Sequence, residues 1–136
     1  MREIIFDTET TGLSPENGDR IVEFGAIELV NLTPTGSVFH AYYNPNRPMD
    51  AVAQGIHGLS DTFLADKPLF EDAVEDLLDF IGDAPLIAHN AMFDLGFLNH
   101  ELKLCGRLAI PRERIIDTLG LARSKFPGVK HSLDAL

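Results

Sequence analysis

Hydrophobic residues in the first third of the chain occur in short runs that are typical of β-strands. Glu3 to Asp7 is rich in β-branched and aromatic residues, which predicts a buried strand. Ile21 to Leu32 and Val38 to Tyr43 are also rich in strand-forming residues, and the turn sequence NLTPTG, 31 to 36, joins them. The three segments together predict an antiparallel meander.

The pattern changes to helical spacing in the second half of the chain. Apolar side chains recur three and four residues apart from Phe70 to Ile81, with acidic residues between them, which predicts an amphipathic helix. Leu86 to Ala88 predicts a short buried strand, Met92 to Leu104 a second helix, and Ile115-Ile116 a further strand. A helix is expected from Thr118 to Phe126. Strands first and strand–helix alternation afterwards predict a mixed sheet flanked by helices.

Composition limits the classes of protein that this chain can belong to. Its 136 residues, 45% of them hydrophobic, predict a single domain with one core. The net charge of -10 argues against a protein that grips long nucleic acid by itself, but not against an enzyme whose metal ions offset clustered carboxylates. Cys105 is the only cysteine, which excludes an intramolecular disulfide and a zinc site of several cysteines. No signal-peptide core or membrane-length apolar run is evident, so a cytoplasmic location is expected.

Two carboxylates, Asp7 and Glu9, stand one residue apart at the end of the first apolar run. Side chains two apart on a strand point to the same face, so both would face one cleft, with Thr8 and Thr10 facing the other way. Paired carboxylates repel unless a cation or a shared proton lies between them, and Mg²⁺ or Mn²⁺ suits such oxygen ligands. A polar strand end without a ligand remains the alternative for this pair alone.

The segment AHNAMFDLGFL, 88 to 98, repeats this arrangement. His89 and Asn90 follow a predicted strand, and Asp94 lies in the first turn of a predicted helix. The helix dipole stabilises a carboxylate there, so Asp94 is also explained as an ordinary first-turn charge. The sequence GIHGL, 55 to 59, predicts a loop in which His57 either approaches a ligand or is solvated.

Together these segments resemble one known family. FDTETTGL (6 to 13) and HNAMFDLGFL (89 to 98) resemble the first and second motifs of the DEDD 3′–5′ exonucleases, of the DEDDh type. IHGL (56 to 59) matches their histidine loop, and ARSKFPGVKHSLDAL (122 to 136) resembles the stretch that leads to their third motif. The resemblance covers essentially the whole chain. It is greatest with the branch that proofreads for bacterial replicative DNA polymerases.

The resemblance implies a ribonuclease-H-like α/β fold. Its mixed five-stranded sheet would consist of a three-stranded antiparallel meander plus two parallel strands, with Asp7 and Glu9 on the central strand. It also implies metal-dependent hydrolysis of the terminal phosphodiester at the 3′ end of single-stranded DNA. The implied protein partner is the polymerase catalytic subunit of a replicase.

The resemblance further implies roles for individual residues. Asp7 would bridge two divalent ions, Mg²⁺ or Mn²⁺, Glu9 would bind one of them, and Asp94 would hold the second through water. Asp7 and Glu9 would also contact the substrate. The other residues expected to line the pocket for the terminal nucleotide are Thr10, His57 and Asn90.

The family's third motif supplies a general-base histidine and a last metal-binding aspartate. Both are expected beyond the final SLDAL, so residues 1–136 are expected to form one exonuclease domain that ends before this motif and is inactive by itself. His131 precedes the helix start that Ser132 would cap, and it is not that base. Val52 also departs from the family, because close relatives carry a substrate-contacting glutamate there.

Three other functions fit parts of the sequence. An RNA-trimming exonuclease of the same family would carry the same motifs. A phosphatase of the haloacid-dehalogenase type also begins with a strand followed by a DxDxT-like sequence, in which Asp7 would be the nucleophile and Glu9 a general acid. A non-catalytic binding module would retain the fold without the chemistry.

Overall fold

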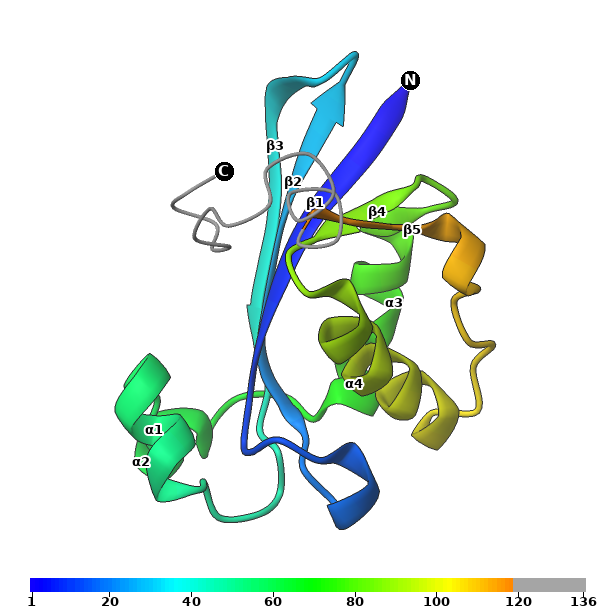
Figure 1. Cartoon of the computed structure of the whole chain (residues 1–136). Coiled ribbons are helices and arrows are strands. Elements are labelled where there is room, and N and C mark those ends of the chain that lie inside the picture. The colour runs from blue at the N-terminus through cyan, green and yellow to red at the C-terminus, as the bar shows by residue number, and fades with distance from the viewer. Residues whose placement is uncertain (119–136) are drawn as a thin grey trace, which may run out of the picture.

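A five-stranded mixed sheet forms the centre of the molecule in the computed structural model, which describes residues 1–118 (Figure 1). The strand order is β3-β2-β1-β4-β5, so β1 is the central strand. Strands β1, β2 and β3 pair antiparallel, whereas β4 and β5 run parallel to β1. The strands are β1 (Arg2–Thr10), β2 (Ile21–Val30), β3 (Thr33–Tyr42), β4 (Leu86–Ala88) and β5 (Ile115–Asp117). The predicted meander and the two predicted parallel strands are confirmed.

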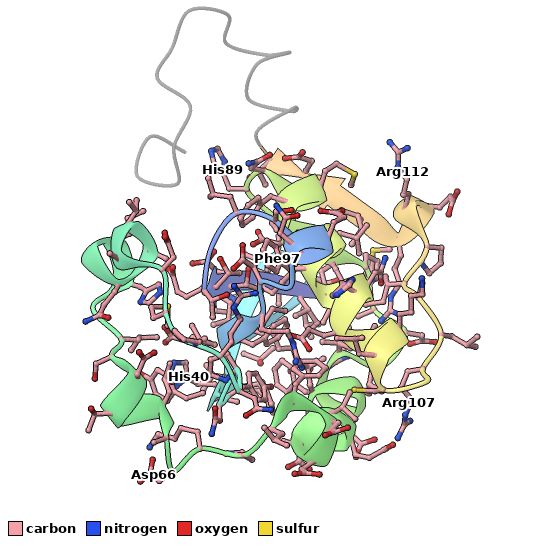
Figure 2. All side chains as sticks on the ribbon, turned by 90° about the horizontal axis from the view of Figure 1, so that it is seen from below. His40, Asp66, His89, Phe97, Arg107 and Arg112 are labelled. Carbon is pink, nitrogen blue, oxygen red and sulfur yellow. The ribbon has the colours of Figure 1, made fainter. Side chains whose placement is uncertain are left out.

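Two helices, α3 (Phe70–Ile81) and α4 (Ala91–Leu104), pack on one face of the sheet (Figure 1). The buried face of α3 consists of the apolar residues predicted from the spacing, namely Phe70, Val74, Leu77 and Ile81. These side chains join Ile4 and Phe6 of β1 and Phe97 of α4 in one hydrophobic core. Figure 2 shows Phe97 in the crowded interior, whereas Arg107 and Arg112 project at the periphery.

Several strand bounds differ from the predicted ones, since β1 is longer, β3 begins earlier and β2 ends at Val30 rather than Leu32. Strand β1 continues to Thr10, because Thr8 and Glu9 still pair with Phe24 and Glu23 of β2. The predicted turn over residues 31 to 36 is too long. Asn31 and Leu32, with φ of 51° and 67°, form the whole two-residue turn, and β3 begins at Thr33. Positive φ at both turn residues gives a backbone twist that matches a hairpin.

The predicted loop around His57 is wrong, because His57 is the last residue of a short helix, α1 (Ala51–His57). The side chain of Asp50 accepts a hydrogen bond from the Ala53 amide and caps the first turn, while Gly58, at φ 73°, ends the helix. A second short helix, α2 (Asp61–Leu64), follows. It was not predicted, nor were the 3₁₀ turns η1 (Pro15–Asn17) and η2 (Arg112–Arg114).

The structure has no helix within residues 1–118 that is long and apolar enough to cross a membrane. The predicted helix from Thr118 to Phe126 lies outside the described residues except for Thr118, and the predicted helix start at Ser132 also lies outside them.

Candidate active site

Asp7 and Glu9 lie on the same side of β1, near its carboxyl end. Asp7 is exposed and Glu9 half-buried, whereas Thr8 and Thr10 are both buried on the side that carries the helices. The alternation predicted for these four residues is therefore observed. It places two carboxylates side by side at the edge of the core.

The two carboxylates oppose each other's ionisation. Burial raises the pKa of Glu9 above its usual value, and the negative charge of Asp7 raises it further. Partial burial also raises the pKa of Asp7, with a smaller contribution from the charge of Glu23 on β2. A cation between such groups would remove the repulsion, and hard divalent ions prefer these oxygen donors. The chemistry of Asp7 and Glu9 therefore fits a metal site.

Asp94 reaches the same region from α4. Strands β4 and β1 are parallel, so their carboxyl ends share one edge of the sheet, and the helix that follows β4 begins beside the end of β1. The Asp94 side chain is buried, and its Oδ1 accepts a hydrogen bond from Thr8 Oγ1 at 2.5 Å. Burial raises the Asp94 pKa from 3.8 to about 7, and the charges of Asp7 and Glu9 also raise it.

The three predicted ligands are thus electrostatically coupled but do not converge on one point. Asp7 and Glu9 share the exposed side of β1, while the Asp94 carboxylate is turned toward Thr8. Within residues 1–118, no three Asp, Glu, His or Cys side chains are gathered closely enough to hold a metal ion in this conformation.

A cavity of about 420 Å³ lies beside Glu9, between α1 and the start of α4. Its polar lining includes Glu9, Thr10 and His57, which sequence reasoning placed there. The apolar lining includes Leu13, Ile56 and Phe93, for which no pocket role was predicted, and Val52, which stands where the family is expected to carry a substrate-contacting glutamate. Leu13, Val52 and Ile56 are largely exposed, with 81%, 71% and 74% of their surface accessible. Such an apolar wall suits a ligand with a flat ring, and an anionic group of that ligand could approach Glu9 only with a cation between them.

His57 is held by both ring nitrogens. Nδ1 accepts a hydrogen bond from the Leu59 amide at 3.0 Å, so the proton of a neutral ring lies on Nε2, which faces the Thr10 carbonyl oxygen at 3.0 Å. A carbonyl oxygen only accepts hydrogen bonds, which agrees with this tautomer. His57 therefore ties α1, one wall of the cavity, to the end of β1.

Asn90 does not line the cavity. It is exposed, takes a left-handed conformation with φ 60° at the start of α4, and donates its backbone N–H to Asp117 Oδ1 at 3.1 Å. Asp117, at the end of β5, is a further carboxylate whose charge raises the Asp94 pKa, and sequence reasoning missed it. The signal was present, because Ile115-Ile116-Asp117-Thr118 repeats the strand-then-Asp-Thr pattern of β1.

The loop after β1 has little freedom. A Cβ atom on Gly12 would lie 2.4 Å from Asp19 Oδ2, so the close approach of the two segments requires glycine. The Asp19 carboxylate accepts hydrogen bonds from Thr11 Oγ1 at 2.9 Å and from the Ser14 amide at 3.1 Å. These contacts hold Leu13 at the rim of the cavity.

Fold and site place carboxylates near the end of a central strand, and comparison with known proteins gives the family of this chain. The family model described as Exonuclease matches residues 4–136, and the chain belongs to this exonuclease family.

Curated relatives are named DNA polymerase III subunit epsilon. The one from Rickettsia typhi is 57% identical over 139 residues, and the one from Escherichia coli is 44% identical over 143 residues. These alignments cover 100% and 99% of this chain but 61% and 58% of the relatives, so the chain spans about three-fifths of their length.

Solved structures agree with this assignment. Exonuclease X in complex with 5′ overhanging duplex DNA has a TM-score of 0.74 and 31% identity, covering 98% of this chain and 70% of that one. The metal-free Escherichia coli exonuclease I–ssDNA complex has a TM-score of 0.86 at 16% identity, covering 99% of this chain and 34% of that one, and shows the shared fold. The predicted ribonuclease-H-like fold is confirmed. The family assignment argues against the phosphatase alternative, and so does the antiparallel meander, rather than a long helix, that follows β1.

Proposed function

We propose that this chain carries the catalytic domain of a metal-dependent 3′–5′ exonuclease that removes the terminal nucleotide of a DNA strand. The observation that supports this most is the position of Asp7 and Glu9, side by side near the end of the central strand, with Glu9 lining a largely apolar cavity. Family membership and the epsilon-subunit relatives support the same reaction.

Divalent metal ions would be held by carboxylates of this chain. Asp7 and Glu9 would bind them directly, and Asp94, through a water molecule, would complete the set. Such ions, when bound, activate a water molecule and stabilise the leaving 3′ oxygen. The chain's own contribution is to place these carboxylates at the edge of the core, and a bound cation would favour their ionised forms.

The cavity would take the terminal nucleotide. Leu13, Ile56 and Phe93 offer apolar surface for the base, while Glu9 and Thr10 lie at the end where the sugar and scissile phosphate would be. His57 would act here by holding α1 in place, since both its ring nitrogens are already engaged.

A polymerase would deliver the substrate. A domain with a net charge of -10 is repelled by long DNA, so we expect it to act on a 3′ end handed over by the catalytic subunit of a replicase, in the cytoplasm. The name of the curated relatives supports this partner.

The test compares hydrolysis by the complete gene product with that by Asp7→Asn and Glu9→Gln variants. Single-stranded DNA and RNA of one sequence, labelled at the 3′ end, are incubated with Mg²⁺ or Mn²⁺, and mononucleotide release is measured. Either substitution should abolish release, whereas Asp66→Asn, at an exposed surface ion pair, should not. Faster release from RNA would indicate the RNA-trimming function, and substantial release by both variants would contradict the metal assignment.

A further inference from the structure

Thr8 is a buried polar residue whose hydroxyl points at a predicted metal ligand. On the core-facing side of β1, apolar Ile4 and Phe6 are followed by Thr8, which is only 7% exposed. Its Oγ1 donates to Asp94 Oδ1 at 2.5 Å, across 86 residues of sequence. Thr10, the next residue on that side, donates instead to the Gly12 carbonyl in its own loop. Thr8 thus provides the one side-chain hydrogen bond, within residues 1–118, between β1 and α4.

The geometry leaves half of the Asp94 carboxylate available. Thr8 engages Oδ1, whereas Oδ2 accepts no hydrogen bond from residues 1–118. Asp94 is 4% exposed, so little solvent is available to orient its carboxylate. A donor fixed on a central strand therefore decides which way this side chain points. Groups that hydrogen-bond to a metal ligand orient it in the same way in many metalloproteins.

We propose that Thr8 is a positioning residue for the metal ion that Asp94 helps to bind. It holds Oδ1 and leaves Oδ2 to bind the ion or a water molecule of its shell. The inference rests on the proposed function, because it requires a divalent metal at this site. It assigns to the second residue of the D-T-E sequence a role in metal affinity, distinct from the ligand roles of Asp7 and Glu9.

The experiment measures Mn²⁺ affinity of the complete gene product by calorimetry or electron paramagnetic resonance, without substrate. Thr8→Val keeps the side-chain shape and removes the hydroxyl, and it should weaken Mn²⁺ binding by about 10- to 100-fold. Thr8→Ser should restore affinity close to that of the unmodified protein. Thr11→Val is the matched control, because it removes an equally buried hydroxyl that binds Asp19 and the Arg20 amide instead.

A double-substitution cycle separates orientation of Asp94 from a general effect on folding. If Thr8 acts through Asp94, Thr8→Val should have no further effect on Mn²⁺ affinity in an Asp94→Asn background. If Thr8→Val fails to fold, Thr8→Ala replaces it in the double-substitution cycle. Unchanged affinity in Thr8→Val, or an equal loss in the Asp94→Asn background, would overturn the inference alone. Absence of Mn²⁺ binding by the unmodified protein would overturn the proposed function itself.

Discussion

Arg20 and Glu101 form a two-point ion pair that joins the loop after β1 to the last turns of α4. The Nε and Nη2 atoms of Arg20 lie 2.9 and 2.7 Å from the two carboxylate oxygens of Glu101. Glu101 is 1% exposed and also accepts the Ile21 amide at 2.9 Å. Hydrogen bonding to Glu101 raises the pKa of Arg20 above its usual value. The pair links the segment that carries Leu13 to the helix that carries Asp94.

Replacing Glu101 with alanine should destabilise the fold by about 3 kcal/mol. This is the lower end of the range for breaking a buried pair, because part of the Arg20 side chain stays in contact with solvent. The free energy of unfolding from urea titrations measures the effect. Glu75→Ala, which removes a surface partner of Arg107, is the control and should cost less than about 1 kcal/mol. Equal losses of unfolding free energy in Glu101→Ala and Glu75→Ala would show that burial of Glu101 does not increase the contribution of its ion pair to stability.

His57→Ala should raise KM more than it lowers kcat. The substitution removes the hydrogen bond to the Thr10 carbonyl, so the α1 wall of the cavity loses its attachment to β1 while the carboxylates stay in place. Steady-state hydrolysis of a short 3′-labelled DNA strand measures both constants. A large fall in kcat at unchanged KM would instead place His57 in the chemical step.

The metal-free protein should become less stable as pH rises past the ordinary pKa of Asp94. Burial raises this pKa from 3.8 to about 7, so the folded state binds the proton more tightly than the unfolded state. Stability contributed by the bound proton is therefore present at acidic pH and lost as pH rises between these two values. Asp94→Asn should thus stabilise the protein at about pH 8 by a few kcal/mol at most, since one pKa unit corresponds to about 1.4 kcal/mol.

Thermal unfolding with a chelator at about pH 3 and pH 8 checks the pH prediction, because these two values lie on either side of the titration. Asp66→Asn, an exposed aspartate, is the control and should show no such difference between the two pH values. If Asp94→Asn stabilised the protein equally at both pH values, the charge of Asp94 would not be the cause of the stabilisation.

Local sequence patterns predict the regular elements of this fold well. The apolar spacing gives α3 at its observed bounds, Phe70 to Ile81, because one continuous face of that helix is buried. The apolar run Leu86 to Ala88 likewise gives β4. The pattern fails at α1, where Val52 and Ile56 have helical spacing but are exposed, and only Ala53 is buried. That helix depends on its caps and on hydrogen bonds to β1 instead.

The residues of the candidate site also divide into some that the sequence predicts and others that it does not. Asp7 and Glu9 are predictable because strand alternation alone puts them on one side. The hydrogen bond between Thr8 and Asp94 cannot be predicted in this way, since it depends on how β1 and α4 are placed in space. The strand-then-Asp-Thr pattern at residues 115–118 marks Asp117, but its contact with the Asn90 amide depends on the parallel pairing of β5 with β4. Long-range contacts of this kind leave no signal in a single sequence.

Replacing one oxygen of the scissile phosphate with sulfur tests most directly whether Asp7 and Glu9 hold metal ions against that phosphate. In the substrate, a DNA strand, sulfur replaces one non-bridging oxygen of the terminal phosphodiester, and the two stereoisomers are used separately. The rate at which the complete gene product releases the last nucleotide is measured. Mg²⁺ prefers oxygen ligands and Mn²⁺ accepts softer ones. Hydrolysis of one stereoisomer should therefore be slow with Mg²⁺ and should recover with Mn²⁺. Equal rates with both ions for both stereoisomers would contradict a metal–phosphate contact in the reaction.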